Sequence, residues 1–130
     1  MKPGAIRDLR ALLMGMEPKL GQRAWVFAPH SEDAMIPATA FAVVREDEGP
    51  CAIIPAEAGP KDAVPFARIT LQVNSDLEAV GLTSAVATAL ASSGVACNII
   101  AGLHHDLLLV PWERREDAMK TLEKVSRDAN

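Results

Sequence analysis

The chain has 130 residues, enough for one compact unit that buries roughly two-thirds of the surface its unfolded form exposes. A hydrophobic content of 49% argues against disorder. The net charge is −4 and the 13 basic residues are scattered, so nucleic acid is not expected as a partner, because phosphate binding needs a clustered basic face. No segment approaches the roughly 20 apolar residues that span a bilayer, and Met1-Lys2-Pro3 lacks the apolar core of a secretory signal. We therefore expect a cytoplasmic protein with no membrane partner, in which Cys51 and Cys97 are reduced thiols.

The first half of the chain predicts one helix and three strands. Apolar residues recur first at helical spacing, which is typical of an amphipathic helix, and Pro18 and Gly21 are expected to end it. A strand is built on Trp25-Val26-Phe27, and two more strands flank a hairpin turn that contains Gly49. The predicted elements are a helix over 4–15, a strand over 23–28, a polar loop over 29–37, and strands over 39–45 and 51–54.

The second half predicts a strand, a helix, two strands and a final helix. Residues 66–73 alternate between apolar and polar side chains, which is the pattern of a half-buried strand. Ser75 and Glu78 have the spacing of a capping box at a helix start, and Gly94 is placed to end that helix with a left-handed residue. The remaining predicted elements are strands over 95–101 and 107–110 and a helix over 113–127.

This order of elements predicts an α+β protein. The second half has the β-α-β-β-α layout of a ferredoxin-like fold and lacks only its closing strand. Residues 55–65, rich in proline, glycine and alanine, join two halves that we place at 1–62 and 63–130. Each half has too little sheet to stand alone, so we expect one antiparallel sheet across both halves, with helices on one face. Residues 107–110 are apolar at successive positions, so the first half or a second subunit must cover the other face of that strand.

The turn Asn74-Ser75-Asp76 and the helix start Gly81-Leu82-Thr83 form the strongest candidate site. Backbone N–H groups at a helix start attract a carboxylate, and a glycine there lets a ligand approach the main chain closely. Asn74, Ser75 and Thr83 can add hydrogen bonds, and Asp76 can hold an ammonium group. The alternative is that these residues only cap the helix and close the turn.

His104-His105-Asp106 is the second candidate, as a metal or acid–base cluster. Adjacent strand residues point to opposite faces, so the two histidines can bind one ion only if a turn separates them, and zinc needs a third protein ligand. The alternative is a hairpin turn in which Asp106 caps backbone amides. The acidic turn Glu46-Asp47-Glu48 is expected to face solvent. The sequence holds no nucleophile elbow, phosphate-binding glycine loop, HExxH or CxxC motif, so neither a cofactor nor a metal is expected.

Several stretches resemble known proteins. The segment from Gly81-Leu82-Thr83 to Gly94-Val95, which follows a strand, resembles the ACT regulatory domain. More narrowly, the chain is similar to a family of short bacterial proteins built from two ACT-like halves, in stretches 73–83, 97–102 and 104–111. This resemblance covers nearly the whole chain. It implies that an amino-acid effector lies against the glycine turn and against the strand residues Asn98-Ile99-Ile100.

The sequence thus predicts a non-catalytic regulatory ACT-type module that binds a small molecule, expected to be an amino acid, and that forms a homodimer. The expected ligand residues are Asn74, Ser75, Asp76, Gly81, Leu82, Thr83, Asn98, Ile99 and Ile100, with His104, His105 and Asp106 as additional contacts. Two alternatives stay open. One is a structural scaffold whose sheet serves only to dimerise, and the other is a metal-dependent enzyme that uses the His104-His105-Asp106 cluster.

Overall fold

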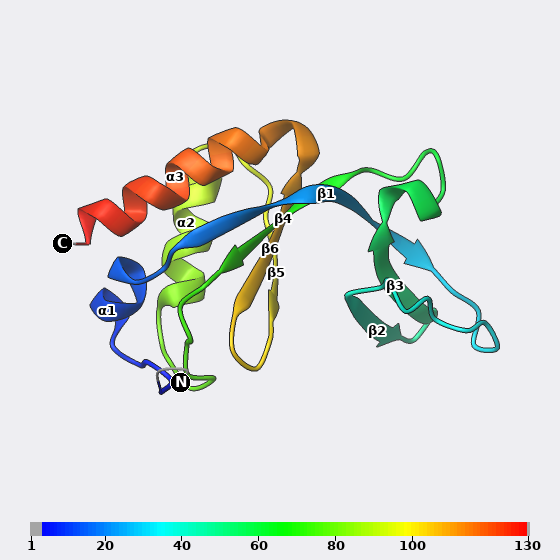
Figure 1. Cartoon of the computed structure of the whole chain (residues 1–130), viewed down its shortest axis with the longest axis horizontal. Coiled ribbons are helices and arrows are strands. Elements are labelled where there is room, and N and C mark those ends of the chain that lie inside the picture. Colours follow the sequence, from blue (N-terminus) through cyan, green and yellow to red (C-terminus); the bar gives the residue numbers. More distant parts are fainter. Residues whose placement is uncertain (1–3, 130) are drawn as a thin grey trace.

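The computed structural model describes residues 4–129, which form a six-stranded sheet and three α-helices (Figure 1). The sheet order is β2-β3-β1-β4-β6-β5, and every neighbouring pair of strands is antiparallel. The elements are α1 (Leu9–Met14), β1 (Pro18–Pro29), β2 (Ala42–Glu46), β3 (Gly49–Pro55), β4 (Phe66–Leu71), α2 (Leu82–Ser92), β5 (Asn98–Ala101), β6 (Asp106–Pro111) and α3 (Arg115–Asp128), with short 3₁₀ helices η1 (Ala56–Ala58) and η2 (Trp112–Arg114).

Strand β1 belongs to both halves of the molecule. Its first part pairs with β4, from Pro18 opposite Leu71 onward, and its last part pairs with β3, ending with Pro29 opposite Cys51. Figure 1 shows it running from the helical end of the molecule to the β2–β3 hairpin. Beside β4, it occupies the place of the closing strand that the second half lacks. The expected α+β fold, with one antiparallel sheet across two halves, is confirmed.

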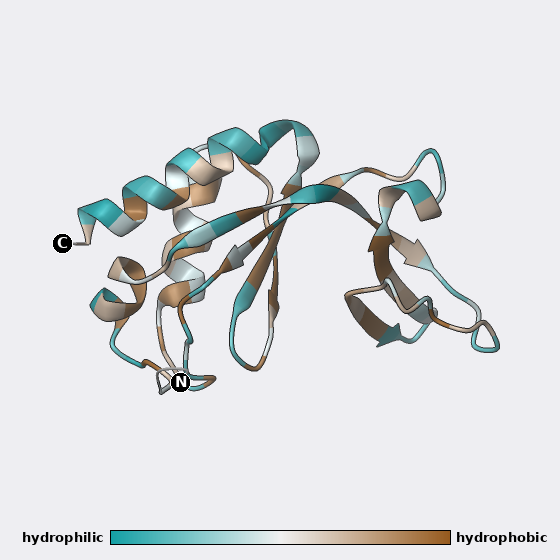
Figure 2. Ribbon diagram, viewed as in Figure 1, coloured by the Kyte–Doolittle hydropathy of each residue, from teal (hydrophilic) through white to brown (hydrophobic). Residues whose placement is uncertain are grey.

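The helices pack against one face of the sheet. Ile69 and Leu71 of β4 and Leu108 and Val110 of β6 turn toward them, and all four side chains are buried. Helix α3 is hydrophilic over most of its visible surface in Figure 2, whereas its inner residues Ala118 and Leu122 are fully buried. Hydrophobic burial of this kind is the main force that holds the helices to the sheet.

The other face of β6 is covered by the first half of the chain. Leu109 is fully buried in one cluster with Trp25 of β1 and Ile53 of β3. The guanidinium of Arg68 lies 5.4 Å from the centre of the Trp25 ring and 4.9 Å from that of Phe41, close enough for cation–π attraction. Of the two expected partners for this face, the first half is therefore the one that covers Leu109.

Several predicted boundaries were wrong. The first helix begins at Leu9 rather than at residue 4, because Asp8 caps it by accepting a hydrogen bond from the Ala11 N–H at 2.9 Å. Pro18 does not follow the helix as a breaker but begins β1, a position where proline costs no ladder hydrogen bond. Gly21 also lies inside β1. The last helix begins at Arg115, after the 3₁₀ turn η2.

The remaining sequence-level expectations concern the membrane, the cysteines and the N-terminus. Among the described residues, no helix combines the length and the apolar character needed to cross a membrane. Cys51 and Cys97 are both free, and burial raises the pKa of the Cys97 thiol to about 11. Met1-Lys2-Pro3, whose sequence argued against a secretory signal, lies outside the described residues.

Replacing Leu109 with alanine should destabilise the protein by about 2–5 kcal/mol, because it leaves a cavity in the cluster that joins the two halves. Urea unfolding, followed by circular dichroism, measures this loss. Leu103→Ala is the matched control, since Leu103 is 71% exposed and its truncation should change stability by no more than about 0.5 kcal/mol. Equal stability of the two variants would contradict the role given to Leu109.

Candidate functional site

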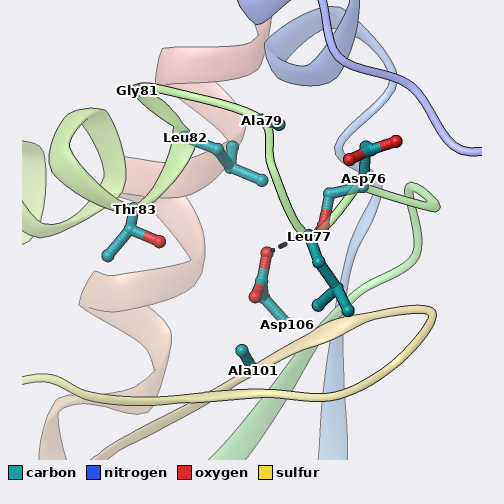
Figure 3. Close-up of a pocket in the computed structure, with 9 residues that line it drawn as sticks. Asp76, Leu77, Ala79, Gly81, Leu82, Thr83, Ala101 and Asp106 are labelled. Carbon is teal, nitrogen blue, oxygen red and sulfur yellow. Dashed lines mark hydrogen bonds between the residues drawn. The ribbon is translucent and has the colours of Figure 1, made fainter.

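A cavity of about 130 Å³ lies where loop 74–81 meets the start of α2 and the adjoining ends of β5 and β6 (Figure 3). Its walls combine main-chain groups, small side chains and two carboxylates. The lining residues are Ser75, Asp76, Leu77, Ala79, Gly81, Leu82, Thr83, Ala101 and Asp106. The structure therefore brings together both parts of the candidate turn site, together with one residue of the candidate histidine cluster.

The start of α2 has free hydrogen-bonding capacity. Gly81 is the N-cap residue, and within the described chain no side chain caps the helix. The capping box predicted for Ser75 and Glu78 is wrong, because both residues lie in the loop well before the helix begins at Leu82. The first N–H groups of a helix have no partner within the helix, and Leu82 and Thr83, which belong to this first turn, line the cavity at the positive end of the helix dipole. Such a helix end favours a carboxylate or another anion.

Asp106 supplies negative charge on the opposite wall. It is the first residue of β6, is partly buried, and points into the cavity in Figure 3. The Ser75 hydroxyl donates a hydrogen bond to Asp106 Oδ2 at 3.2 Å, which fixes the carboxylate in this orientation. The cavity lining contains no basic side chain. Asp106 is therefore available to a cationic group.

Asp76 lines the cavity, but its carboxylate is already engaged. Oδ1 accepts a hydrogen bond from the Glu78 N–H at 2.8 Å, and Oδ2 lies 3.0 Å from the Arg7 Nε. The hydrogen bond from Glu78 and, after it, the one from Arg7 lower the pKa of Asp76 below its usual value. Figure 3 shows this carboxylate turned away from the centre of the cavity.

Gly81 is required by packing as well as by backbone conformation. Its φ of +109° lies in a region that side-chain-bearing residues rarely adopt. A Cβ atom at this position would lie only 3.0 Å from Cδ2 of Leu9 in α1. The side of Gly81 on which a side chain would stand is thus occupied by Leu9, whereas the sequence suggested that the glycine admits a ligand.

The strand residues expected at the site lie elsewhere. Asn98 and Ile100 face away from the helices, and Ile99 packs into the helical core, because side chains alternate along β5. Ala101, at the end of β5, lines the cavity instead. Its pairing with Asp106 follows from the short hairpin between β5 and β6, so register reasoning could have found it. No sequence pattern predicts that Leu77 and Ala79 line the cavity, because both residues lie in an irregular loop.

The expected residues Asn74, His104 and His105 also lie outside the cavity lining. Asn74 accepts a backbone hydrogen bond from the Ile6 N–H. His104 and His105 occupy the turn between β5 and β6 with their ring centres 6.3 Å apart. The Nδ1 atom of His105 is buried without a hydrogen-bond partner in the described part of the protein. Across residues 4–129, no group of three or more His, Cys, Asp and Glu side chains is placed to hold a metal ion.

Known proteins resemble most of this chain. Two ACT-domain family models match the chain, over residues 4–69 and 65–124. A structure from Vibrio cholerae, of a protein of unknown function suggested as a possible transport protein, is 36% identical with a TM-score of 0.72, covering 86% of this chain and 91% of that one. A protein from Agobacterium tumefaciens is 19% identical with a TM-score of 0.68, covering 84% and 87%. A search of curated protein sequences finds no match.

The third likeness is to an enzyme much longer than this chain. The aspartate kinase of Clostridium acetobutylicum, an allosteric enzyme, is 13% identical with a TM-score of 0.63. The match covers 85% of this chain but 34% of the kinase. At this identity, and at that of the Agobacterium protein, the likeness is one of fold.

The chain belongs to the ACT-domain family, as its sequence predicted. ACT domains generally bind small-molecule ligands in regulation, which gives the class of protein to which this fold belongs. The two matched ranges overlap at residues 65–69, just before and within the start of β4, so the division of the chain after residue 62 stays a prediction.

Gly81→Ala should destabilise the protein for two reasons. The positive φ costs a residue with a side chain about 1–2 kcal/mol, and the new Cβ atom would clash with Leu9. In a Leu9→Ala background the same substitution should cost less, which a double-mutant cycle of urea unfolding measures. Gly94→Ala is the control, since Gly94 also has a positive φ, of +72°, but open space around its Cβ position. A Gly81–Leu9 coupling no larger than the Gly94–Leu9 coupling would show that Leu9 does not require the glycine.

Proposed function

We propose that this protein is a non-catalytic regulatory module that binds a small α-amino acid in the cavity at the start of α2. The observation that supports this proposal most strongly is that the two walls of the cavity have opposite electrostatic character. Open main-chain amides lie beside Leu82 and Thr83, and the Asp106 carboxylate lies opposite them. An α-amino acid carries a carboxylate and an ammonium group on one carbon, so it can satisfy both walls at once.

The cavity volume also favours a small ligand. An engineered protein cavity of about 150 Å³ holds benzene, a molecule with six heavy atoms. The 130 Å³ found here suits a molecule of similar size, such as alanine or serine. Asp106 takes the ammonium role that the sequence suggested for Asp76, because the Asp76 carboxylate is already paired with Arg7.

Regulation follows if the ligand binds one arrangement of the protein better than another, because binding then shifts the population toward that arrangement. The loop that forms one wall of the cavity touches the first half of the chain at Ile6 and Arg7. A bound ligand therefore acts on the contact between the two halves. A cytoplasmic location and a homodimeric state complete the proposal.

A scaffold function without a ligand is the second candidate. Edge strand β2 exposes Val43 and Val44, by 42% and 49%, and an exposed apolar edge strand favours assembly with another chain. This alternative requires that no amino acid stabilises the protein. The two functions are thus separated by a ligand screen.

A thermal-shift screen against the twenty amino acids and common nucleotides should find at least one small amino acid that stabilises the protein. At about one hundred times its dissociation constant, such a ligand adds about 2.7 kcal/mol to the free energy of unfolding.

Asp106→Asn should weaken binding about 10-fold to 100-fold, because it removes one charge-assisted hydrogen bond worth about 1.5–3 kcal/mol.

Asp47→Asn is the matched control for charge. It makes the same change in an exposed turn between β2 and β3, at the end of the molecule far from the cavity in Figure 1. Calorimetric titration should give this variant the affinity of the wild type. Equal affinities for Asp106→Asn and the wild type would place the ligand elsewhere, and stabilisation by no amino acid would favour the scaffold.

A further inference from the structure

A short segment before α1 runs beside the loop that forms the cavity wall. The Ile6 N–H donates to the Asn74 carbonyl at 2.9 Å, and the Asp76 N–H donates to the Ile6 carbonyl at the same distance. These two hydrogen bonds make Ile6 and Ser75 a parallel β-bridge outside the main sheet. A segment of the first half of the chain is thus joined to the beginning of loop 74–81.

Arg7 adds a second connection, through its side chain. Its Nε atom lies 3.0 Å from Asp76 Oδ2, and its Nη2 atom lies 2.8 Å from Glu78 Oε2. The planar guanidinium suits two acceptors at once, because its donors are fixed in a fork. Arg7 therefore bridges two residues of the loop that are also joined to each other by the hydrogen bond from the Glu78 N–H to Asp76 Oδ1.

Leu9 reaches the other end of the loop. It packs over Gly81, the last loop residue before α2. Between these two attachments, the side chains of Leu77 and Val80 are 68% and 83% exposed, so the middle of the loop buries little apolar surface. The loop shape thus depends on its attached ends and on the turn that Asp76 makes with Glu78 and Ala79.

We propose that Arg7 is a positioning residue, and that segment 6–9 is a latch that holds loop 74–81 in the conformation that forms the cavity. The inference rests on the proposed function only for what the cavity binds. The latch places control of the site in the first half of the chain, although the cavity itself is built from the second. If the loop adopts the binding conformation for only part of the time, the apparent affinity falls by that fraction.

Amide hydrogen exchange by NMR, without ligand, tests the latch directly. Arg7→Gln should speed exchange of the Asp76, Glu78 and Ala79 amides about fivefold, the effect expected from one exposed ion-pair network, while Val95 at the far end of α2 keeps its wild-type rate. Arg7→Lys should restore part of the protection, because the cation remains. Arg10→Gln is the control, since Arg10 lies in α1 and donates to the Ala129 carbonyl instead of the loop.

Three results would overturn the latch: unchanged exchange of these amides in Arg7→Gln, equal acceleration in Arg10→Gln, or the same acceleration at Val95, which would mean global destabilisation.

Titration with L-alanine and L-serine is the second readout. Arg7→Gln should weaken any binding seen in the wild type about fivefold, and Arg7→Lys should recover part of it. Absence of binding in the wild type would count against the proposed function, whereas the exchange rates decide the latch alone.

Discussion

Strand β1 pairs with another strand along each of its two edges, and in this way it joins the two halves of the molecule into one sheet. It pairs with β3 through residues 25–29 and with β4 through residues 18–25. Without β1, β2 and β3 would form an isolated hairpin, which is marginally stable in water. The second half would equally lack the fourth strand of its ferredoxin-like sheet. Burial of Trp25 together with Ile53 and Leu109 adds a side-chain connection to the backbone one.

The two halves repeat one pattern but differ in their helices. In each half the third strand runs into a proline and then a 3₁₀ turn, with Pro55 at φ −55° and ψ 139° and Pro111 at φ −51° and ψ 136°. After η1, Gly59 and Pro60 stop the chain from continuing as a helix, whereas η2 leads directly into α3. The first half also has no helix between β1 and β2, where the second half has α2 between β4 and β5. Among the described residues, a helix between the first and second strands is therefore present in the second half alone, and the candidate site lies at the start of that helix.

Local patterns predicted most of the elements, and long-range contacts decided what they missed. Alternation in residues 66–73 predicted β4, which ends at Leu71, and the glycine turn at Gly49 predicted the β2–β3 hairpin. The start of α1 was misplaced because Ile6 pairs with Ser75, a contact that helical periodicity cannot reveal. The spacing of Ser75 and Glu78 matches a capping box and so predicts a helix cap. In the structure the Ser75 hydroxyl instead donates to Asp106, on a strand that follows much later in the chain. The polar turn and the helix start predicted a candidate site at the place where the cavity lies, and the β5–β6 register could have added Ala101, whereas Leu77 depends on how the irregular loop folds.

The charge balance of the cavity is likewise set by a distant residue. Two carboxylates line it, and if both were free, the site would favour a dication over a zwitterion. Arg7 pairs with Asp76, whose carboxylate is turned outward, so Asp106 is left as the carboxylate that points into the cavity. The open amides of α2 then balance that single negative charge on the other wall. The preference that we propose, for a ligand with one positive and one negative group, would thus depend on both halves, because Arg7 belongs to the first half and the cavity lining to the second.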